Sequence, residues 1–411
     1  DVAFERPKGW LTGGKSSLAI DIVDYPGEWL LDLPLLEMSF SEWSRTTLAA
    51  ARTGARATPF APFLAHLAAI DPAAKAEERL ARELAETFTT ALVACRQEGI
   101  GLSALPPGRF LMPGDLEGSP ALTFAPLPLA GATVSKSLAA MMERRYEAYK
   151  DVVVRPFFRD HFARLDRQIV LVDALQALNA GPRAVADLAE ALADILACFR
   201  PGKTSWLASI LTRRIDRIVF AATKADHLHR TSHDRLERIL RRLVADAMER
   251  ATFAGAEVDV VALAAVRATR EATVEHDGEK LPAILGMPLP GETLGGEDLD
   301  PTAEFALFPG DLPEDPDSIF PPADSPHEDA DSASRAAANS DSGSGAWAGV
   351  PDSPAKLRRA ADSESEHEEP AVEFVRFRPP RLEKTAEGFT LSLPHIRLDR
   401  TLEFLLGDRL T

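Results

Sequence analysis

Four short segments are apolar and have the length of β-strands. They are residues 18–23, 168–172, 215–222 and 258–263. The last three are almost continuous runs of Val, Ile, Leu, Phe and Ala, which is typical of strands that are buried on both faces of a parallel sheet. Helical patterns with apolar residues at three- and four-residue spacing lie between them, notably at 184–199 and 232–253. This alternation predicts a three-layer α/β domain with a mostly parallel sheet.

A long insertion, residues 29–166, separates the first apolar segment from the second and far exceeds an ordinary crossover connection. Residues 75–97 and 137–165 carry periodic apolar side chains, whereas residues 105–128 are interrupted by Pro and Gly. We therefore expect a helical subdomain with an extended stretch. The chain then has five parts: a hairpin and strand of the main domain (1–28), the helical insertion (29–166), the remainder of the α/β domain (167–310), an acidic segment (311–371), and a C-terminal strand and helix that pack on the core (372–411).

Negative charge is concentrated in one segment. Residues 311–370 contain fifteen Asp and Glu residues against four Lys and Arg residues, so they hold most of the net charge of −17. Residues 321–370 are also rich in Ser and Pro and have almost no large apolar side chain, so burial cannot offset the entropy of ordering them. We expect a largely disordered segment here, which either serves as a solvated linker or binds a protein partner. The acidity does not favour nucleic acid as a partner.

The overall composition is that of a globular protein, with 45% apolar and 27% charged residues. No apolar run approaches the length of a membrane-spanning helix, so no integral membrane segment is expected. Cys95 and Cys198 each lie inside an apolar helical pattern. This placement favours buried free thiols in a reducing compartment such as the cytoplasm over a disulfide.

The first apolar segment ends in the motif Asp24-Tyr25-Pro26-Gly27. The motif fits the D-x-x-G element of phosphate-binding NTPases, in which the carboxylate reaches Mg²⁺, usually through water, and the Gly amide meets a γ-phosphate. Such a short pattern also occurs by chance. Here, however, the Pro-Gly pair forces a loop at the carboxyl end of an expected strand, where α/β proteins bind ligands. The position therefore favours a binding role over a simple turn.

The third apolar segment ends in Thr223-Lys224-Ala225-Asp226. This string resembles the N/T-K-x-D element of guanine-nucleotide sites, in which the Asp accepts two hydrogen bonds from the guanine edge and the Lys stem lies along the base. The alternative is an exposed charged loop that caps the following helix. A further guanine-binding loop would follow the next strand, where residues 264–269 are mostly small. Ala265 and Val266 are its candidate contact residues.

Residues 9–16, Gly-Trp-Leu-Thr-Gly-Gly-Lys-Ser, satisfy the phosphate-loop pattern G-x-x-x-x-G-K-[ST] letter for letter. A working phosphate loop needs a strand before it and a helix after it, because the helix N-terminus supplies the amide groups and the dipole that hold the phosphates. Here Ser17 runs directly into the apolar segment 18–23, which leaves no residues for a helix. We therefore expect a hairpin turn, with a rearranged phosphate loop as the alternative.

Five separated strings resemble the YcjX family of bacterial stress-associated P-loop GTPases. They are residues 21–34, 107–110, 166–173, 220–227 and 393–399, which read DIVDYPGEWLLDLP, PGRF, DRQIVLVD, FAATKADH and LPHIRLD. The resemblance spans nearly the whole chain. It implies a P-loop NTPase-like fold and a cytoplasmic protein that binds GTP and GDP and hydrolyses GTP with Mg²⁺. It also implies an unknown protein partner.

The resemblance further implies roles for individual residues. Asp24 would hold Mg²⁺ through water, and Gly27 would sense the γ-phosphate. Glu28 stands where many GTPases place the Gln that orients the attacking water. The guanine-binding set would consist of Thr223, Lys224, Asp226, Ala265 and Val266. In the family the phosphate loop, its helix and the first switch precede the region aligned with Asp1, so we expect this chain to be impaired in GTP turnover.

Two classes of function are consistent with these features. The first is a GTPase. The second is a non-catalytic interaction or scaffold protein, in which the helical insertion and the acidic segment bind partners. In the family the strand before the phosphate loop is central to the sheet. A chain without it is expected to have exposed apolar strand edges and a tendency to aggregate.

Overall fold

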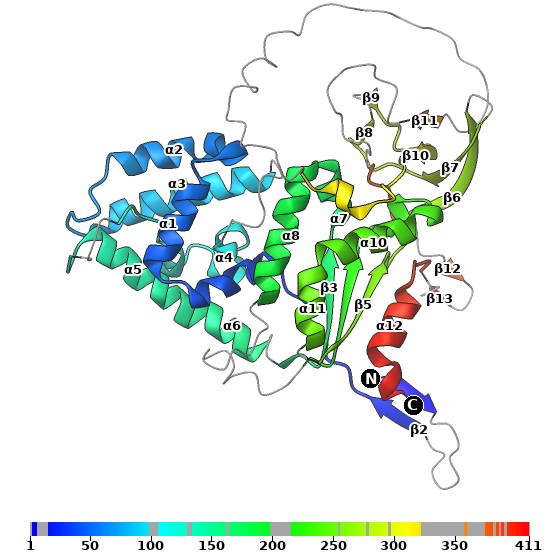
Figure 1. Ribbon diagram of the computed structural model, residues 1–411, viewed down its shortest axis with the longest axis horizontal. Coiled ribbons are helices and arrows are strands. Elements are labelled where there is room, and N and C mark those ends of the chain that lie inside the picture. Colours follow the sequence, from blue (N-terminus) through cyan, green and yellow to red (C-terminus); the bar gives the residue numbers. More distant parts are fainter. Residues whose placement is uncertain are drawn as a thin grey trace, which may run out of the picture.

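A computed structural model gives the fold (Figure 1). It describes residues 2–5, 15–97, 106–129, 134–161, 164–197, 215–253, 255–276, 279–294, 297–321, 357–359, 375–380, 384–385, 388–389 and 393–410. A three-stranded parallel sheet with its covering helices forms the centre. Figure 1 shows the helical insertion and a smaller β-rich part on opposite sides of this centre.

The central sheet consists of three parallel strands. In spatial order they are β3 (Arg167–Val172), β4 (Arg217–Ala222) and β5 (Glu257–Ala262). Their register is even, since Arg167 pairs with Arg217 and Arg217 with Glu257. Strand β4 is buried along almost its whole length, as its uninterrupted apolar sequence requires. Three of the four strands expected from the apolar runs are thus confirmed, and the combination of helices with a parallel sheet agrees with the α/β class.

Helices cover both faces of this sheet, which gives three layers (Figure 1). On one face lie α7 (Ala174–Asn179), α8 (Pro182–Ala197), α10 (His233–Leu243) and α11 (Ala245–Phe253). Phe220 belongs to the core on this side. The next residue along β4, Ala221, belongs to the core on the other side, where Leu405 of α12 (Leu398–Leu406) is buried. The alternation of side chains along each strand therefore supplies both layers.

The apolar segment 18–23 is not a strand of the central sheet, contrary to the expectation from its sequence. Strand β2 (Lys15–Leu18) ends where that segment begins and pairs with β1 (Val2–Glu5) in an antiparallel hairpin, which projects away from the sheet in Figure 1. Residues 19–26 are not in a strand, and Ile22 is 87% exposed. A strand needs a hydrogen-bonded neighbour, and an apolar pattern alone does not provide one.

The outer edge of β3 is open within the described residues, where β3 pairs only with β4. Two apolar side chains of this strand, Ile169 and Leu171, are 40% and 64% exposed. Helix α12 packs on β4 and β5, so it does not cover Ile169 and Leu171. This agrees with the expected exposed apolar strand edge.

Residues 27–160 contain a helical unit with its own core. Its larger elements are the 3-10 helix η1 (Gly27–Glu37), α1 (Phe40–Ala50), α2 (Ala57–Ala68), α3 (Glu78–Gln97), α4 (Gly108–Leu111), α5 (Leu138–Tyr149), the π-helical turn η6 (Lys150–Val154) and α6 (Arg155–Asp160). Trp43 stacks on Tyr146 with ring centroids 5.1 Å apart, and Phe88 and Phe124 meet the Trp43 ring edge-on. This aromatic core is separate from the core of the sheet domain.

A buried carboxyl group fastens η1 to the rest of the helical unit. Asp32 Oδ1 accepts a hydrogen bond from Gly108 N at 2.7 Å. Asp32 Oδ2 accepts from the Tyr149 hydroxyl at 2.6 Å and from Arg109 N at 3.4 Å. Burial raises the pKa of Asp32 to about 7, although these donors and the charge of Arg109 act to lower it. The group therefore titrates near neutral pH in the folded protein.

Stability is expected to depend on pH through Asp32. A carboxyl group whose pKa is higher in the folded than in the unfolded protein favours folding at low pH, and this contribution is lost as the pH rises through the folded value. Between about pH 4 and about pH 8 the wild type should lose up to about 4 kcal/mol of unfolding free energy relative to Asp32→Asn, which cannot ionise. Urea unfolding of both proteins at a series of pH values measures this difference. Parallel pH profiles would contradict the assignment.

A β-rich part follows the α/β core. Its four-stranded sheet has the order β11 (Leu357–Arg359), β10 (Phe305–Phe308), β7 (Glu279–Gly286) and β6 (Arg270–His276). Two short hairpins accompany it, β8 (Thr293–Leu294) with β9 (Glu297–Asp298) and β12 (Lys384–Thr385) with β13 (Gly388–Phe389). Ile284, Leu307 and Phe377 are among its core residues.

The structure describes the first residues of the acidic segment, which precede the stretch 321–370 that is expected to be disordered. Leu312 and Ile319 are buried in the same core as α10, and residues Pro316–Ile319 form the 3-10 helix η10. Three ion pairs join this stretch to α10. They are Arg235–Asp311, Arg235–Glu314 and Arg242–Asp317, with N–O distances of 3.6, 3.0 and 2.5 Å. Apart from β11, residues 322–374 lie outside the described residues, and with them most of the segment predicted to be disordered.

None of the helices in the described part of the chain is long and apolar enough to cross a membrane. Cys95 is a buried thiol in α3, in agreement with its apolar helical pattern. Cys198 lies outside the described residues.

Candidate functional site

The loops after the three parallel strands meet at one edge of the sheet. Because the strands are in register, Asp173, Thr223 and Leu263 follow them at the same level. Thr223 N donates to the Val172 carbonyl at 3.0 Å, and Ala225 N donates to the Leu263 carbonyl at 3.2 Å. The carboxyl edge of parallel strands is where open α/β sheets bind ligands.

The loop that carries Lys224 is held in an uncommon backbone conformation. Lys224 has a φ of 60°, in the left-handed region, which costs a non-Gly residue about 1–2 kcal/mol. His233 fixes the following residue, since its Nε2 donates to the Ala225 carbonyl at 2.9 Å. Burial lowers the pKa of His233, so the ring is neutral at pH 7. Backbone strain of this kind persists where surrounding contacts enforce it, and it is typical of functional loops.

Asp226 lies at the centre of this edge and is only 5% exposed. Its Oδ2 accepts a hydrogen bond from Ala268 N at 2.9 Å, and its backbone carbonyl accepts from Thr269 Oγ1 at 2.5 Å. The loop after β5 therefore wraps around Asp226. The carboxylate orientation is set before any ligand is present.

The same loop carries the other two residues that the sequence suggested for the guanine site. Ala265 and Val266 are both exposed. The C-terminal segment supports their backbone, because Ala264 forms an antiparallel bridge with Ile396 and Arg267 N donates to the Pro394 carbonyl at 2.7 Å. The structure thus brings the loop of Thr223, Lys224 and Asp226 together with the loop of Ala265 and Val266.

An ion pair joins Lys224 to the strand on its other side. Lys224 Nζ lies 2.5 Å from Asp173 Oδ2. The other carboxylate oxygen, Asp173 Oδ1, caps α7 by accepting a hydrogen bond from Gln176 N at 3.2 Å. Sequence reasoning missed Asp173 as a site residue. Its sequence signals are that it directly follows an expected parallel strand and that it ends the string 166–173, which resembles the YcjX family.

His227 connects this edge to the β-rich part. Its ring meets Phe377 edge-on, with ring centroids 6.1 Å apart. Burial lowers the pKa of His227, although the neighbouring Asp226 acts to raise it. At neutral pH the ring is therefore uncharged and packs as an aromatic side chain.

Asp24 follows the segment 18–23, which is not a strand of the central sheet. Its side chain is exposed. The hydroxyl of the neighbouring Tyr25 is hydrogen-bonded to Gln168, the second residue of β3, and the Tyr25 ring packs edge-on against Phe157 at 5.2 Å. The described residues contain no group of three or more His, Cys, Asp and Glu side chains that could hold a metal ion.

Gly27 and Glu28 begin the 3-10 helix η1. Gly27 is exposed, and Glu28 Oε1 lies 2.5 Å from Arg96 Nη2. Within the described part of the chain, no hydrogen bond or ion pair joins Asp24, Gly27 or Glu28 to Lys224 or Asp226. The structure therefore leaves the D-x-x-G group apart from the guanine-type group.

A cavity of about 420 Å³ adjoins the D-x-x-G group. Gly27 and Glu28 line it on the side of η1, and Val172 and Asp173 line it at the carboxyl end of β3. Most of its remaining wall is apolar and comes from α7 and α8. Its volume falls in the range of small-molecule sites.

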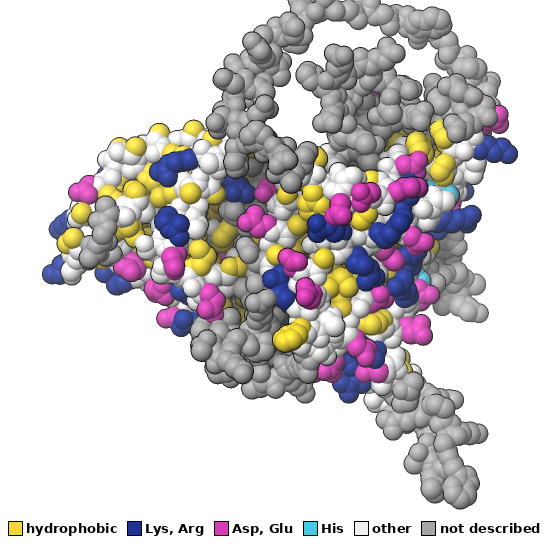
Figure 2. Space-filling view, in the orientation of Figure 1, with side chains coloured by type: hydrophobic (Ala, Val, Ile, Leu, Met, Phe, Trp, Pro, Cys, Tyr) yellow, Lys and Arg dark blue, Asp and Glu magenta, His cyan; other side chains and the backbone are white. Residues whose placement is uncertain are grey.

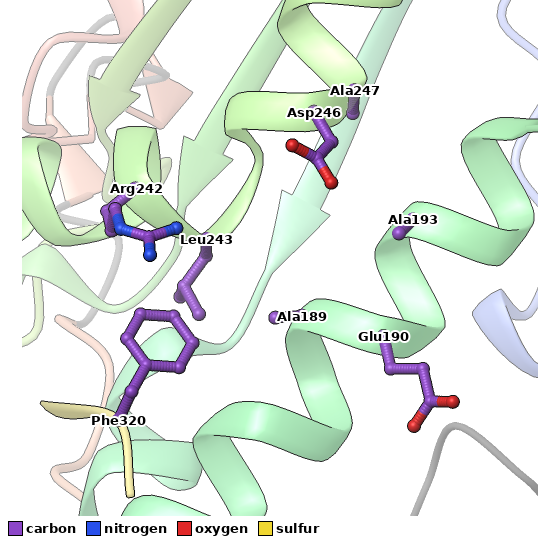
Figure 3. A pocket seen from close by; sticks show the side chains of 8 residues that line it. All are labelled: Ala189, Glu190, Ala193, Arg242, Leu243, Asp246, Ala247 and Phe320. Carbon is purple, nitrogen blue, oxygen red and sulfur yellow. The ribbon is translucent and has the colours of Figure 1, made fainter. Parts of the chain in front are cut away.

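A second cavity, of about 190 Å³, lies between α8 and the pair α10 and α11 (Figure 3). In Figure 3 the ring of Phe320 faces Leu243 and Ala189. The Arg242 guanidinium lies 4.8 Å from the centre of that ring. None of the residues assigned from the sequence motifs lines this cavity, so we interpret it as a packing gap between helices.

Figure 2 shows the face of the molecule that is also seen in Figure 1. The charged side chains on this face are a mixture of both signs rather than a patch of one sign.

Comparison of the sequence with known proteins identifies the family of this chain. The sequence matches the YcjX-like family (DUF463) over residues 1–410. It is 34% identical over 403 residues to the "Ras-like GTPase YcjX" of Escherichia coli K12, a match that covers 96% of this chain and 73% of that protein. It is 31% identical over 419 aligned positions to the "Ras-like GTPase YcjX" of Shewanella oneidensis, covering 100% of this chain and 74% of that protein. This chain therefore belongs to the YcjX-like family, as its five motif strings indicated.

Proposed function

We propose that this protein binds GTP and GDP at the carboxyl edge of the central sheet and hydrolyses GTP with Mg²⁺. The observation that carries the proposal is the position of Asp226, a buried carboxylate fixed by Ala268 N beside an exposed loop. Guanine presents two N–H donors on one edge, and an oriented carboxylate can accept both. The printed name of the two relatives, Ras-like GTPase, supports the same conclusion.

Lys224, Thr223, Ala265 and Val266 complete the guanine site in this proposal. The stem of Lys224 covers one face of the base, and the exposed residues Ala265 and Val266 border its edge. Two observations support these roles, namely the hydrogen bond from Ala268 in this loop to Asp226 and the exposure of Ala265 and Val266.

For the phosphate end, we assign Mg²⁺ binding through water to Asp24, the γ-phosphate contact to Gly27, and positioning of the attacking water to Glu28. These roles require residues 19–26 to move into the sheet. In this proposal they form the outermost strand, beside the strand that adds to the β3 edge left unpaired in the described part of the chain. Arg96, which pairs with Glu28 at 2.5 Å, supplies the cation that a carboxylate beside a phosphate requires.

In this proposal the phosphates are bound by a phosphate loop, with the strand before it and the helix after it, as the family resemblance implies. That strand would pair with the edge of β3 that no described strand occupies. The exposed Ile169 and Leu171 would then be covered. The pattern at residues 9–16 does not suit this role, because Lys15 pairs with Glu5 and Ser16 with Phe4 in the β1–β2 hairpin, where a phosphate loop would begin a helix. From the family resemblance we also infer a stress-associated role in the cytoplasm and a protein partner.

The first test is calorimetric titration of the full-length protein with GDP, GTP, ADP and ATP in the presence of Mg²⁺. Guanine nucleotides should bind at least about 100-fold more tightly, because adenine has an acceptor in place of the guanine N1–H and no amino group beside it. Lys15→Ala is the matched control and should bind as the wild type does. Loss of binding in this folded variant would assign the phosphates to residues 9–16. Absence of guanine binding in both proteins would instead favour an interaction protein.

A further inference from the structure

Lys224 is anchored at both ends of its side chain. Its backbone has a φ of 60°, and its carbonyl accepts a hydrogen bond from His227 N at 2.9 Å. At the other end, Nζ lies 2.5 Å from Asp173 Oδ2. A lysine side chain has four rotatable bonds and many accessible rotamers. Anchoring at both ends selects one path for the stem across the carboxyl edge of the sheet.

Asp173 is itself a rigid anchor. Its Oδ1 caps α7 through Gln176 N at 3.2 Å, and the first turn of that helix is buried through Ala174 and Leu175. The residue directly follows β3, whose last residue, Val172, accepts the hydrogen bond from Thr223 N. Asp173 therefore belongs to the same framework that holds the loop of Lys224.

We propose that Asp173 is a positioning residue for the guanine site, which holds the Lys224 stem in the place where it covers the base. This inference rests on the proposed function. It assigns a role in the guanine site to a residue that lies outside the nucleotide-binding motifs. Without the anchor, Lys224 would have to lose its rotamer freedom on binding, so the affinity for the base would fall. With the anchor, that entropy is already lost in the free protein.

The effect should appear in binding rather than in folding. The Lys224 side chain is 48% exposed, and exposed ion pairs contribute little to stability. Asp173→Asn separates the two roles of this residue, because Asn is as good a helix cap as Asp but carries no charge to hold Nζ. Asp71→Asn is the matched control, since Asp71 Oδ1 likewise accepts a local backbone hydrogen bond, from Ala73 N at 2.9 Å, and lies in the helical insertion.

The test is a double-mutant cycle on the full-length protein, with the GDP affinity measured by calorimetry. Asp173→Asn should weaken GDP binding about 10-fold, and Asp71→Asn should not change it. Lys224→Met keeps the apolar stem but removes the ammonium group. Asp173→Asn should therefore have less than about a 2-fold effect when it is added to Lys224→Met. A merely structural role of Asp173 would give the same loss in both backgrounds.

The outcomes separate this inference from the function on which it rests. If the wild type binds GDP and Asp173→Asn binds it equally well, Asp173 has no positioning role although the guanine site stands. Equal losses in the wild-type and Lys224→Met backgrounds would also overturn the inference. Absence of GDP binding by the wild type would overturn both the inference and the proposed function.

Discussion

Replacing Asp226 by Asn should lower the affinity for GDP at least about 100-fold and create a preference for xanthine nucleotides. The Asn amide would direct an N–H group at the guanine amino group, so one buried donor would face another. Xanthine has a carbonyl oxygen in place of that amino group and matches the Asn amide. Calorimetry with GDP and XDP on the wild type and on Asp226→Asn measures this change of preference.

The fold should survive this replacement. The Asn side-chain oxygen can still accept the hydrogen bond that Ala268 N donates to Asp226 Oδ2 at 2.9 Å. The unfolding midpoint of Asp226→Asn should therefore stay close to that of the wild type. A change of nucleotide preference from GDP to XDP can then be assigned to the site rather than to unfolding. Unchanged affinity for GDP, in a variant that remains folded, would remove Asp226 from the base-binding site.

Replacing Gly108 by Ala should destabilise the helical insertion by at least about 3 kcal/mol. A Cβ atom at this position would lie 1.7 Å from the Glu28 carbonyl oxygen and 2.5 Å from its carbonyl carbon. Both are backbone atoms, so no flexible side chain can move aside. Relief requires separation of α4 from η1, which also breaks the hydrogen bond from Gly108 N to Asp32. Urea unfolding followed by tryptophan fluorescence reports on this unit through Trp29 and Trp43.

Gly27→Ala is the control for this experiment, since it adds the same atom next to the same residue, Glu28. No atom lies within 4 Å of a Cβ at Gly27, so its unfolding free energy should change by no more than about 0.5 kcal/mol. If Gly108→Ala and Gly27→Ala unfold at the same urea concentration, the close approach of α4 to η1 does not exist in solution.

Local sequence was a sound guide where structure depends on neighbours along the chain. The strands β3, β4 and β5 are continuous apolar runs between helical patterns, and burial on both faces demands that composition. The Thr223–Asp226 loop could be placed at the carboxyl edge because it directly follows such a run. The hairpin at β1 and β2 is a similar case, since Ser17 runs directly into the apolar segment 18–23 and leaves no residues for a helix after Lys15.

Local sequence was a poor guide where a strand or a loop depends on a distant partner. Segment 18–23 has the composition of a strand, but pairing is a long-range event, and no described strand lies along it. The composition of the acidic stretch 311–321 does not indicate where it lies, and Arg235 and Arg242 of α10 supply the opposite charges that hold it. In both cases the deciding contact is far away in the sequence.

The amino-acid pattern of this protein was enough to specify the parallel sheet, the helical character of the insertion and the residues of the guanine-type loop, because these follow from burial and from spacing along the chain. The tertiary structure alone decided which groups hold that loop and which hold η1 in the helical unit. Asp173 reaches Lys224 from 51 residues away, and Gly108 reaches Asp32 from 76 residues away. Such contacts depend on how the strands and helices pack together, and no local pattern in the chain encodes that packing.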